Sequence, residues 1–321
     1  MPFEMPVEKW AGAVNTVTIG ATRDQGGTRG STVTLGGSTG LPFLHFEGKT
    51  PNRPALALEV LDTPPAEMPA PLAAAIGDVV NDPVAWARLG VEKYGADAIC
   101  LRFTGAHPDR GNRSPEECAA LTKAMLAAVP VPLILWGCGQ ADKDNDLMPR
   151  VSEVAAGENC LLGTASQDNY KTITAACLAD GHKLITEAPL DINIQKQVNI
   201  LVSDAGLDTS RIVMFQVTGG LGYGMEYAYS IMERTRLAAL GGDRMLSMPL
   251  LAQVGSEVWK AKEARTPEET APQWGPAEAR GLLWETLTAT CFLHGGTDLL
   301  VLWHPQVIVQ TRKILDALMG A

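Results

Sequence analysis

The chain has 321 residues, of which 46% are hydrophobic and 19% charged, with a net charge of -10 and a pI near 5.0. Binding to a phosphate backbone depends on clustered Lys and Arg, so this balance argues against a nucleic acid partner. No apolar segment reaches the roughly twenty residues that cross a bilayer, because the longest candidate, residues 125–136, contains two prolines. The first four residues show no basic region followed by an apolar one, so we expect no secretory signal, no membrane contact and a cytoplasmic location.

Six cysteines are scattered along the chain without a C-x-x-C pair, which does not by itself make a zinc or iron-sulfur site. We expect buried free thiols at these positions. Cys138 stands out only because glycines flank it. The six are Cys100, Cys118, Cys138, Cys160, Cys177 and Cys291.

The amino-terminal segment contains two β-like runs, Val14 to Ile19 and Thr32 to Leu35, joined by a glycine-rich connection. They predict a hairpin-like extension over residues 1–54 that packs on the rest of the chain. The connection is not a P-loop, because no Gly-Lys-Ser/Thr ends it. Its arginines, Arg23 and Arg29, are expected to be solvated or paired with a partner protein.

From residue 55 to residue 321 the pattern changes to short apolar strands that alternate with amphipathic helices. Eight such units predict parallel pairing and a closed (β/α)8 TIM barrel. The predicted strands are Ala55 to Val60, Ala98 to Phe103, Pro132 to Gly137, Asn159 to Leu162, Lys183 to Thr186, Arg211 to Phe215, Ser247 to Ala252 and Asp298 to Leu302. The predicted helices are Pro83 to Tyr94, Pro115 to Ala128, Asp142 to Ala156, Asn169 to Ala179, Ile192 to Ala205, Met225 to Leu240, Pro276 to Phe292 and Pro305 to Met319.

Local signals and one alternative bear on this pattern. Prolines stand near several helix starts, and Ser114 and Asn81 are expected to cap two helices. A doubly wound open sheet is the alternative fold, but it would place its glycine fingerprint after the first strand.

The glycine cluster follows the sixth predicted strand instead and lacks the G-x-G-x-x-G order. It runs Gly219, Gly220, Leu221, Gly222, Tyr223 and Gly224. Four glycines in six residues leave the main chain open to close approach, so this stretch is either a ligand-facing loop or a tight strand-to-helix turn.

Polar residues also follow other strands, at the barrel face that usually carries the ligand site. Asp191 and Asn193 could offer an acceptor and an amide to a heterocycle such as a pterin, or cap the next helix. His304 could start a helix or serve as a ligand. Asp180 and His182 begin a D-x-H-x-x-G corrinoid-binding pattern, but Ile185 replaces its glycine. No catalytic residue and no metal ligand is assigned.

Several long blocks resemble the small subunit of the corrinoid iron-sulfur protein of the acetyl-CoA (Wood-Ljungdahl) pathway of carbon fixation, the delta-type subunit of acetyl-CoA decarbonylase/synthase. The resemblance covers nearly the whole chain. The blocks are residues 24–29, 45–48, 52–54, 188–193, 219–227 and 231–234. Relatives often carry Asp-Pro shortly before the glycines, whereas this chain has Gln216 and Val217, so no acidic role carries over to that position.

The resemblance implies a barrel subunit that pairs with a large subunit, which holds a [4Fe-4S] cluster and a corrinoid-binding domain. The corrinoid (cobalamin) would lie at the interface, over the barrel face. The pair would accept a methyl group from methyltetrahydrofolate through a separate methyltransferase and pass it to acetyl-CoA synthase/CO dehydrogenase, so this chain would be a carrier subunit without catalysis of its own. Polar and backbone contacts to the corrinoid are expected from Asp191, Asn193, Gly219, Gly220, Gly222, Tyr223 and Gly224.

Two other functions remain open from the sequence. A pterin-dependent methyltransferase would use a barrel of related design, with Asp191 and Asn193 on the pterin. A purely structural subunit would never contact the cofactor.

Overall fold

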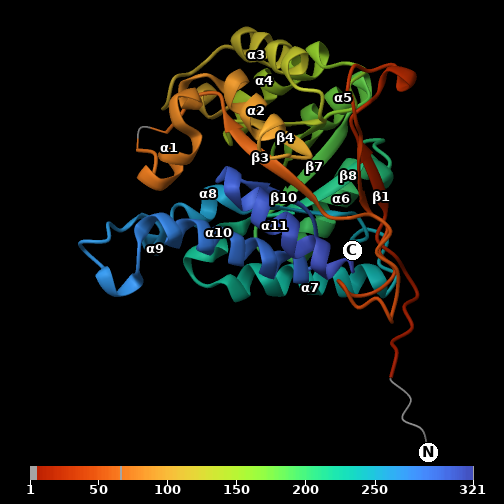
Figure 1. Cartoon of the computed structure of the whole chain (residues 1–321). Helices are drawn as coiled ribbons and strands as arrows, with labels where there is room; N and C mark the ends of the chain where they lie inside the picture. The colour runs from red at the N-terminus through yellow and green to blue at the C-terminus, as the bar shows by residue number, and fades with distance from the viewer. Residues whose placement is uncertain (1–5, 66, 321) are drawn as a thin grey trace, which may run out of the picture.

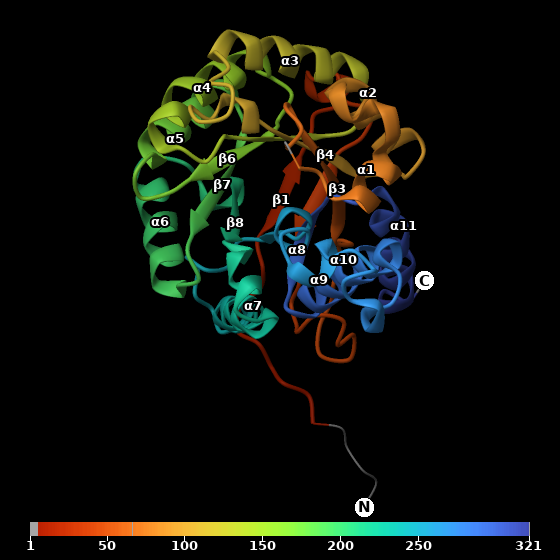
Figure 2. The same ribbon diagram turned by 90° about the vertical axis from the view of Figure 1, so that its left-hand side faces the viewer.

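Eight parallel strands close into a barrel in the order β10-β3-β4-β5-β6-β7-β8-β9. The computed structural model describes residues 6–65 and 67–320, and helices surround the strands (Figure 1, Figure 2). The barrel strands are β3 (Ala55–Leu61), β4 (Ala98–Arg102), β5 (Leu133–Trp136), β6 (Leu161–Ala165), β7 (Lys183–Ala188), β8 (Ile212–Gln216), β9 (Leu250–Gln253) and β10 (Thr297–Leu302). The predicted TIM barrel is confirmed.

All eight predicted helices are present, with ends shifted by at most two residues. They are α2 (Pro83–Glu92), α3 (Pro115–Ala128), α4 (Ala141–Val154), α5 (Tyr170–Asp180), α6 (Ile192–Asp204), α7 (Met225–Leu240), α10 (Ala277–His294) and α11 (Pro305–Leu318). Three short helices lie in the loops after β3 and β9: α1 (Ala70–Ile76), α8 (Gly255–Val258) and α9 (Lys262–Arg265). None of the described helices is long and apolar enough to cross a membrane.

Two local predictions were wrong. Asp82 rather than Asn81 caps α2, because its Oδ1 accepts hydrogen bonds from the amides of Val84 and Ala85, both at 3.0 Å. The fourth predicted strand, β6, starts at Leu161 rather than at Asn159, which has a left-handed φ of 49°. The side chain of Asn159 instead donates to main-chain carbonyls of the amino-terminal segment. The cap at Ser114 is confirmed, with its hydroxyl accepting from the Glu117 amide.

Side chains alternate between the barrel interior and the surrounding helices along each strand, as the period of two requires. On β3, Leu56 and Leu58 belong to the outer core against the helices, whereas Ala55 and Ala57 belong to the inner cluster. The same alternation puts the next inward position, Glu59, near the carboxyl end of the barrel. The sequence of β3 thus places small apolar side chains at the amino-terminal end of the barrel interior (the base) and a polar side chain at its carboxyl-terminal opening (the mouth).

The predicted hairpin is confirmed as an antiparallel pair, β1 (Thr16–Ile19) and β2 (Val33–Gly36). Its buried side chains Val17, Ile19 and Leu35 join the inner cluster of the barrel strands. In Figure 1 the hairpin lies at one end of the barrel, and α8 and α9 project from the other. The hairpin therefore closes the amino-terminal end of the barrel and leaves the carboxyl end for ligands.

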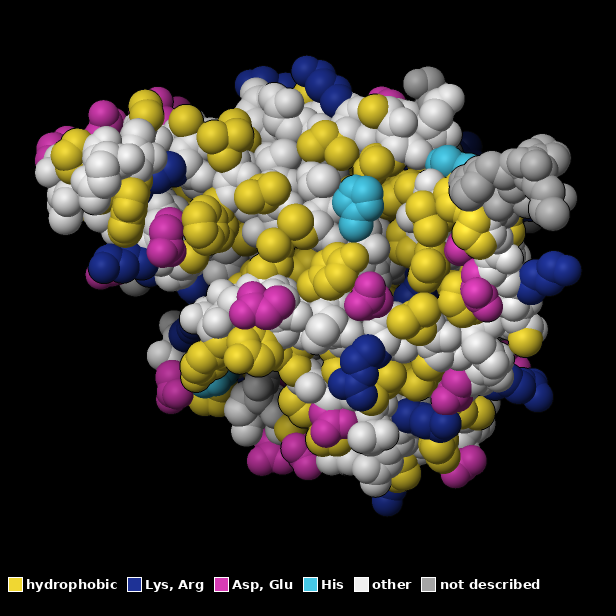
Figure 3. Space-filling model, turned by 90° about the horizontal axis from the view of Figure 1, so that it is seen from below, with side chains coloured by type: hydrophobic (Ala, Val, Ile, Leu, Met, Phe, Trp, Pro, Cys, Tyr) yellow, Lys and Arg dark blue, Asp and Glu magenta, His cyan; other side chains and the backbone are white. Residues whose placement is uncertain are grey.

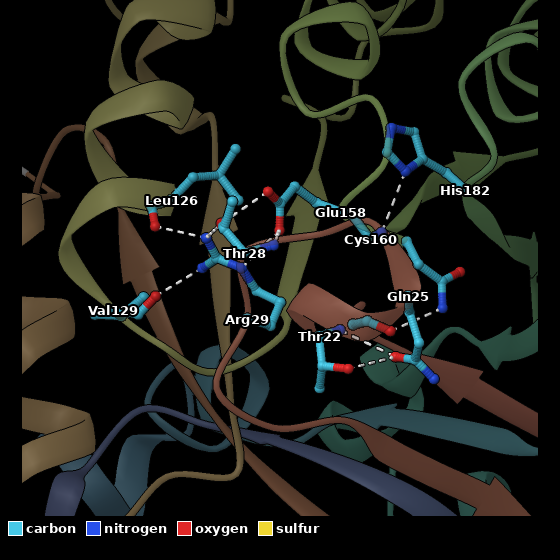
Figure 4. A network of polar contacts seen from close by, with 11 residues as sticks. Thr22, Gln25, Thr28, Arg29, Leu126, Val129, Glu158, Cys160 and His182 are labelled. Atoms are coloured by element: carbon cyan, nitrogen blue, oxygen red, sulfur yellow. Dashed lines mark hydrogen bonds and ion pairs between the residues drawn. The ribbon is translucent and has the colours of Figure 1, made fainter.

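Arg29 fixes the hairpin to the barrel, contrary to the expectation that it is solvated or bound to a partner protein. Its guanidinium contacts Glu158 and donates to the carbonyls of Leu126 and Val129 at 2.6 Å each (Figure 4). The Arg29 side chain is only 1% exposed, whereas Arg23 in the same connection is exposed. The division of the chain at residue 54 stays a prediction, and residues 1–4, considered above for a secretory signal, lie outside the described residues.

Candidate functional site

The carboxyl end of the barrel carries a layer of polar side chains from several strands. Glu59 is fully buried and accepts from Arg102 Nη1 at 3.3 Å and from Gln253 Nε2 at 2.9 Å. Burial raises the pKa of Glu59, and the neighbouring Arg102 opposes that rise. On β7, burial likewise raises the pKa of Glu187. The last inward-facing position of each strand lies at this end of the barrel. Closure of the barrel therefore brings together charged side chains that are more than forty residues apart in sequence, such as Glu59 and Arg102.

Two carboxylates order the loops around this layer. Asp62, after β3, accepts from the Gly105 amide at 2.7 Å and from the Thr104 hydroxyl at 3.1 Å. Asp144, on α4, accepts from the amides of Cys138 and Gly139 at 2.7 and 3.0 Å. Burial and the Asp144 charge raise the pKa of the Cys138 thiol to about 12, so this sulfur is a neutral thiol rather than a nucleophilic thiolate.

A cavity of about 730 Å³ opens beside this layer, on the side of β3, β4 and β10. Its lining includes Arg102, Cys138, Trp303 and the largely buried Trp259. Both tryptophans are held by Glu285 of α10, which accepts from Trp259 Nε1 at 2.6 Å and from the Trp303 amide at 2.6 Å. Burial raises the pKa of Glu285 to about 7.

The glycine stretch forms a short 3-10 helix, Thr218–Gly222, between β8 and α7. Thr218 anchors it, since its hydroxyl donates to the Gln253 carbonyl of β9 at 2.6 Å. Tyr223 follows with 88% of its surface exposed, and Tyr227 on the first turns of α7 is 55% exposed. The stretch is therefore a strand-to-helix connection at the barrel rim, and its aromatic side chains point to solvent.

Gly219 and Gly222 have no glycine requirement within this chain. Neither adopts the left-handed φ region, and a Cβ at Gly222 would meet nothing within 4 Å, while one at Gly219 would meet only Val217 at 3.6 Å. Among the other glycines whose surroundings the structure describes, each has a left-handed φ or an atom within 3.4 Å of such a Cβ. Gly224 meets both conditions, because its φ is +142° and a Cβ there would clash with the Glu226 carboxylate. The tight-turn explanation therefore accounts for Gly224 and leaves Gly219 and Gly222 unexplained.

A shallow hollow of about 350 Å³ lies next to the stretch, between the loops after β7 and β8. Its lining is mainly apolar and includes Pro189, Leu190, Val217 and Gly219. The Val217 amide donates to the Ala188 carbonyl at 3.0 Å, which holds the two loops together. This hollow shares no lining residue with the larger cavity.

The other predicted site residues have visible structural roles. Asp191 caps α6, with Oδ1 accepting from the amides of Asn193 and Ile194 at 2.7 and 3.2 Å. Asn193 is exposed on the first turn. His304 caps α11 by accepting from the Gln306 amide at 3.2 Å, and burial lowers its pKa to about 4. The structure thus places Asp191 and Asn193 one loop away from the glycine stretch, and their ligand roles stay predictions.

Sequence reasoning missed Trp259, Trp303 and Glu285. Trp259 lies between β9 and α10, in a segment for which no helix or strand was predicted, and Glu285 lies in the middle of α10. The sequence did offer a signal for Glu285, which stands in a run of leucines and tryptophan within the predicted helix. An acidic residue inside a helix core needs a partner, so this position predicts a polar contact. No group of three His, Cys, Asp or Glu suited to a metal ion occurs within residues 6–65 and 67–320.

Together these features define an α/β barrel whose base is closed by its own hairpin and whose carboxyl end carries two separate hollows. Residues 16–268 match the family described as CO dehydrogenase/acetyl-CoA synthase delta subunit. The chain belongs to this family.

Curated relatives match this chain over almost its full length. The acetyl-CoA decarbonylase/synthase complex subunit delta of Methanopyrus kandleri is 38% identical over 95% of this chain and 76% of its own length. That of Archaeoglobus fulgidus is 35% identical over 99% of this chain and 71% of its own length.

Solved structures of dihydropteroate synthases share the fold. The Xanthomonas albilineans enzyme in complex with 7,8-dihydropteroate superposes with a TM-score of 0.59 and 13% identity, over 85% of this chain and 97% of its own. The Coxiella burnetii enzyme in complex with pteroic acid gives a TM-score of 0.57 and 12% identity, over 95% and 100%. At this identity the likeness concerns the barrel architecture alone.

Proposed function

We propose that this chain works in an acetyl-CoA decarbonylase/synthase complex as the barrel subunit of a corrinoid iron-sulfur methyl carrier. In this proposal a large partner subunit holds the corrinoid and the [4Fe-4S] cluster, and the rim of this barrel covers one face of the corrinoid. When bound, the corrinoid would supply the carrier chemistry for a methyl group that passes from a methyltetrahydrofolate-dependent methyltransferase to acetyl-CoA synthase. This chain contributes binding surface and shielding rather than a chemical step.

The observation that carries the proposal is the pair Gly219 and Gly222. Neither the backbone conformation nor the packing of this chain requires glycine at these two positions. Close approach of another molecule to the main chain would account for glycine there. The position supports this, because the stretch lies at the carboxyl end of the barrel, where ligands of such folds bind.

The adjacent hollow supports a large, partly apolar occupant. Pro189, Leu190 and Val217 would bury the apolar edge of the corrin ring and exclude water from it, at about 25 cal/mol for each Å² of apolar surface covered. The amides of the glycine stretch and the Tyr223 hydroxyl would donate to amide side chains of the ring. Rigid anchoring of the stretch by Thr218 lowers the entropic cost of these contacts.

A partner subunit also accounts for exposed apolar side chains on neighbouring helices. On α7 and α10 these are Tyr227, Leu283 and Leu287, which are 55%, 64% and 60% exposed. Hydrophobic and charged side chains are mixed on the face that these helices form at the bottom of Figure 1 (Figure 3). Clustered exposed aromatic and aliphatic residues are typical of protein interfaces.

The test is corrinoid retention by the complex isolated with the variant Gly222→Val. We expect the absorption bands of the corrinoid to fall to a small fraction of those of the native complex, while iron content and subunit stoichiometry stay unchanged. The control is Ala124→Val, which adds methyl groups of the same kind on the exposed face of α3. Full corrinoid retention by the Gly222→Val complex would contradict the proposal.

The alternative functions give different results in the same system. If this chain alone binds methyltetrahydrofolate and transfers its methyl group to free cobalamin, it is a pterin-dependent methyltransferase and not a carrier subunit. If Gly222→Val, Gly219→Val and Tyr223→Ala all leave the corrinoid spectrum unchanged, the role is structural.

A further inference from the structure

The 730 Å³ cavity at the barrel mouth has no role in the proposed corrinoid contact. None of the residues from 219 to 224 lines it. Its lining residues belong to the ends of β3 and β4 and the loops after β3, β4 and β5, to α8, α9 and the turn between them, and to Trp303 after β10. Its size is that of a site for a small molecule.

Its charge is opposite to that of the whole chain. Four cationic side chains line the cavity against two carboxylates, in a protein whose net charge is -10. Lys260 and Arg265 are each within ion-pair distance of one carboxylate, Glu257 at 2.7 Å and Glu67 at 3.3 Å. Arg102 contacts Glu59 in the same way, so three of the four cations have a carboxylate partner. Arg110 is the cation for which the described part of the chain offers no ion pair, and it is the one free to meet an anion.

Arg102 is the cation on the floor of the cavity. Its Nη1 contacts the buried Glu59 at 3.3 Å, and its guanidinium carbon lies 5.8 Å from the centre of the Trp136 ring. Its Nε has no hydrogen-bond partner among the described residues. These contacts hold a planar guanidinium in a fixed orientation while its own hydrogen-bonding capacity stays incomplete. A planar Arg fork of this kind suits bidentate binding of a phosphate.

Two tryptophans line the cavity, and Trp303 is the one whose side chain is open to it, because Trp259 is only 2% exposed. Glu285 receives hydrogen bonds from Trp259 Nε1 and from the main-chain amide of Trp303, and the Trp259 ring stacks against His304 at 6.0 Å between centroids. These contacts fix the Trp259 ring and the main chain at Trp303, so the half-buried Trp303 indole supplies the apolar surface of the cavity. Flat apolar walls beside cations select a ligand that has both a planar ring and a negative group.

We propose that this cavity binds a phosphate ester of a planar aromatic or heteroaromatic group. The phosphate lies at Arg102 and Arg110, and the ring lies along Trp303. A phosphate is favoured over a carboxylate because its three acceptor oxygens can engage both arginines. This site is independent of the corrinoid contact proposed above.

The test uses the full chain and phenyl phosphate as the probe, with binding measured by titration calorimetry. We expect saturable binding that Arg102→Met weakens by about tenfold or more, as loss of a charge-assisted contact does. Arg110→Met should also weaken binding, and because Arg110 is exposed, this variant tests the proposal without risk to folding. Lys123→Met, which removes an exposed cation on the outer face of α3, is the control and should bind as the native chain does.

Matched ligands test the two halves of the site separately. Phenol and benzoate should each bind at least about tenfold more weakly than phenyl phosphate, and Trp303→Leu should reduce the preference for phenyl phosphate over inorganic phosphate. Absence of saturable binding, equal affinity for phenol, or unchanged affinity in both arginine variants would overturn the proposal. Gly222→Val should bind phenyl phosphate normally, so failure of this inference is distinguishable from failure of the corrinoid assignment.

Discussion

Arg29 Nε lies 2.8 Å from Glu158 Oε2, across 129 residues of sequence, and this ion pair ties the amino-terminal hairpin to the segment before β6. The Glu158 carboxylate also accepts from the Thr28 amide and hydroxyl at 3.1 and 2.8 Å. All of these groups belong to one network at the base of the barrel (Figure 4). The base is thus closed by a buried polar contact as well as by apolar packing.

Replacement of Arg29 with methionine should destabilise the fold by about 3–5 kcal/mol, because it leaves a largely buried carboxylate without its partner charge. Urea unfolding of the full chain measures this loss. Arg23→Met in the same connection is the matched control, and it should change the free energy of unfolding by less than about 0.5 kcal/mol. Equal effects of the two substitutions would show that the Arg29 contact contributes little.

Ile19 tests whether the hairpin is part of the barrel core. Its side chain is fully buried in the inner cluster, so Ile19→Ala should cost about 2–5 kcal/mol through lost burial and the cavity that remains. Thr32→Ala, at an exposed position of the same hairpin, should be nearly neutral. A hairpin that unfolds separately from the barrel would instead give two transitions and an Ile19→Ala effect confined to the first.

The fold could be predicted from the sequence because each repeating unit carries its own local signals. Apolar runs such as those of β4 and β8 are bounded by prolines, glycines and caps, and the parallel barrel follows from eight repeats of strand and helix. The burial of Arg29 could not be predicted in this way. Its partners come from α3 and from the segment before β6, and only barrel closure brings them together.

The candidate site shows the same division. The alternation along β3 and β4 puts Glu59 and Arg102 at the mouth of the barrel, so the predicted strands alone indicate their position. Trp259, Trp303 and Glu285 were missed because their contact depends on how α10 packs against two loops. Conversely, Asp191 carries two hydrogen bonds that any helix cap makes, so its residue type does not distinguish a cap from a ligand.

Glu285 should give the protein a measurable pH dependence. Burial raises its pKa to about 7 in the folded chain, from an ordinary value of 4.5. The folded state therefore binds this proton more tightly than the unfolded state, so the contribution is fully present below about pH 4.5 and is lost as the pH rises through 7. Relative to Glu285→Gln, the native chain should lose about 3 kcal/mol of stability across this window.

The comparison with Glu285→Gln is needed because His304 acts in the opposite direction. Burial lowers the pKa of His304 to about 4, so its contribution is present above about pH 6.5 and is lost as the pH falls. Urea unfolding of both chains from about pH 5 to about pH 8 separates the two groups. A stability difference that does not vary with pH would mean that Glu285 stays ionised or stays protonated throughout.

Tyr223 separates a role in binding from a role in folding. Because 88% of its surface is exposed, Tyr223→Ala should change the free energy of unfolding by less than about 0.5 kcal/mol. An exposed tyrosine at the centre of an interface nevertheless contributes more than about 1 kcal/mol to binding, so the affinity of this chain for the proposed corrinoid-bearing subunit should fall roughly tenfold. Ile200→Ala removes a side chain that is 38% exposed on α6, away from the glycine stretch, and should leave that affinity unchanged. If Tyr223→Ala weakens neither the subunit affinity nor the corrinoid absorption, the partner does not cover the rim beside Gly222, and the glycines there need another explanation.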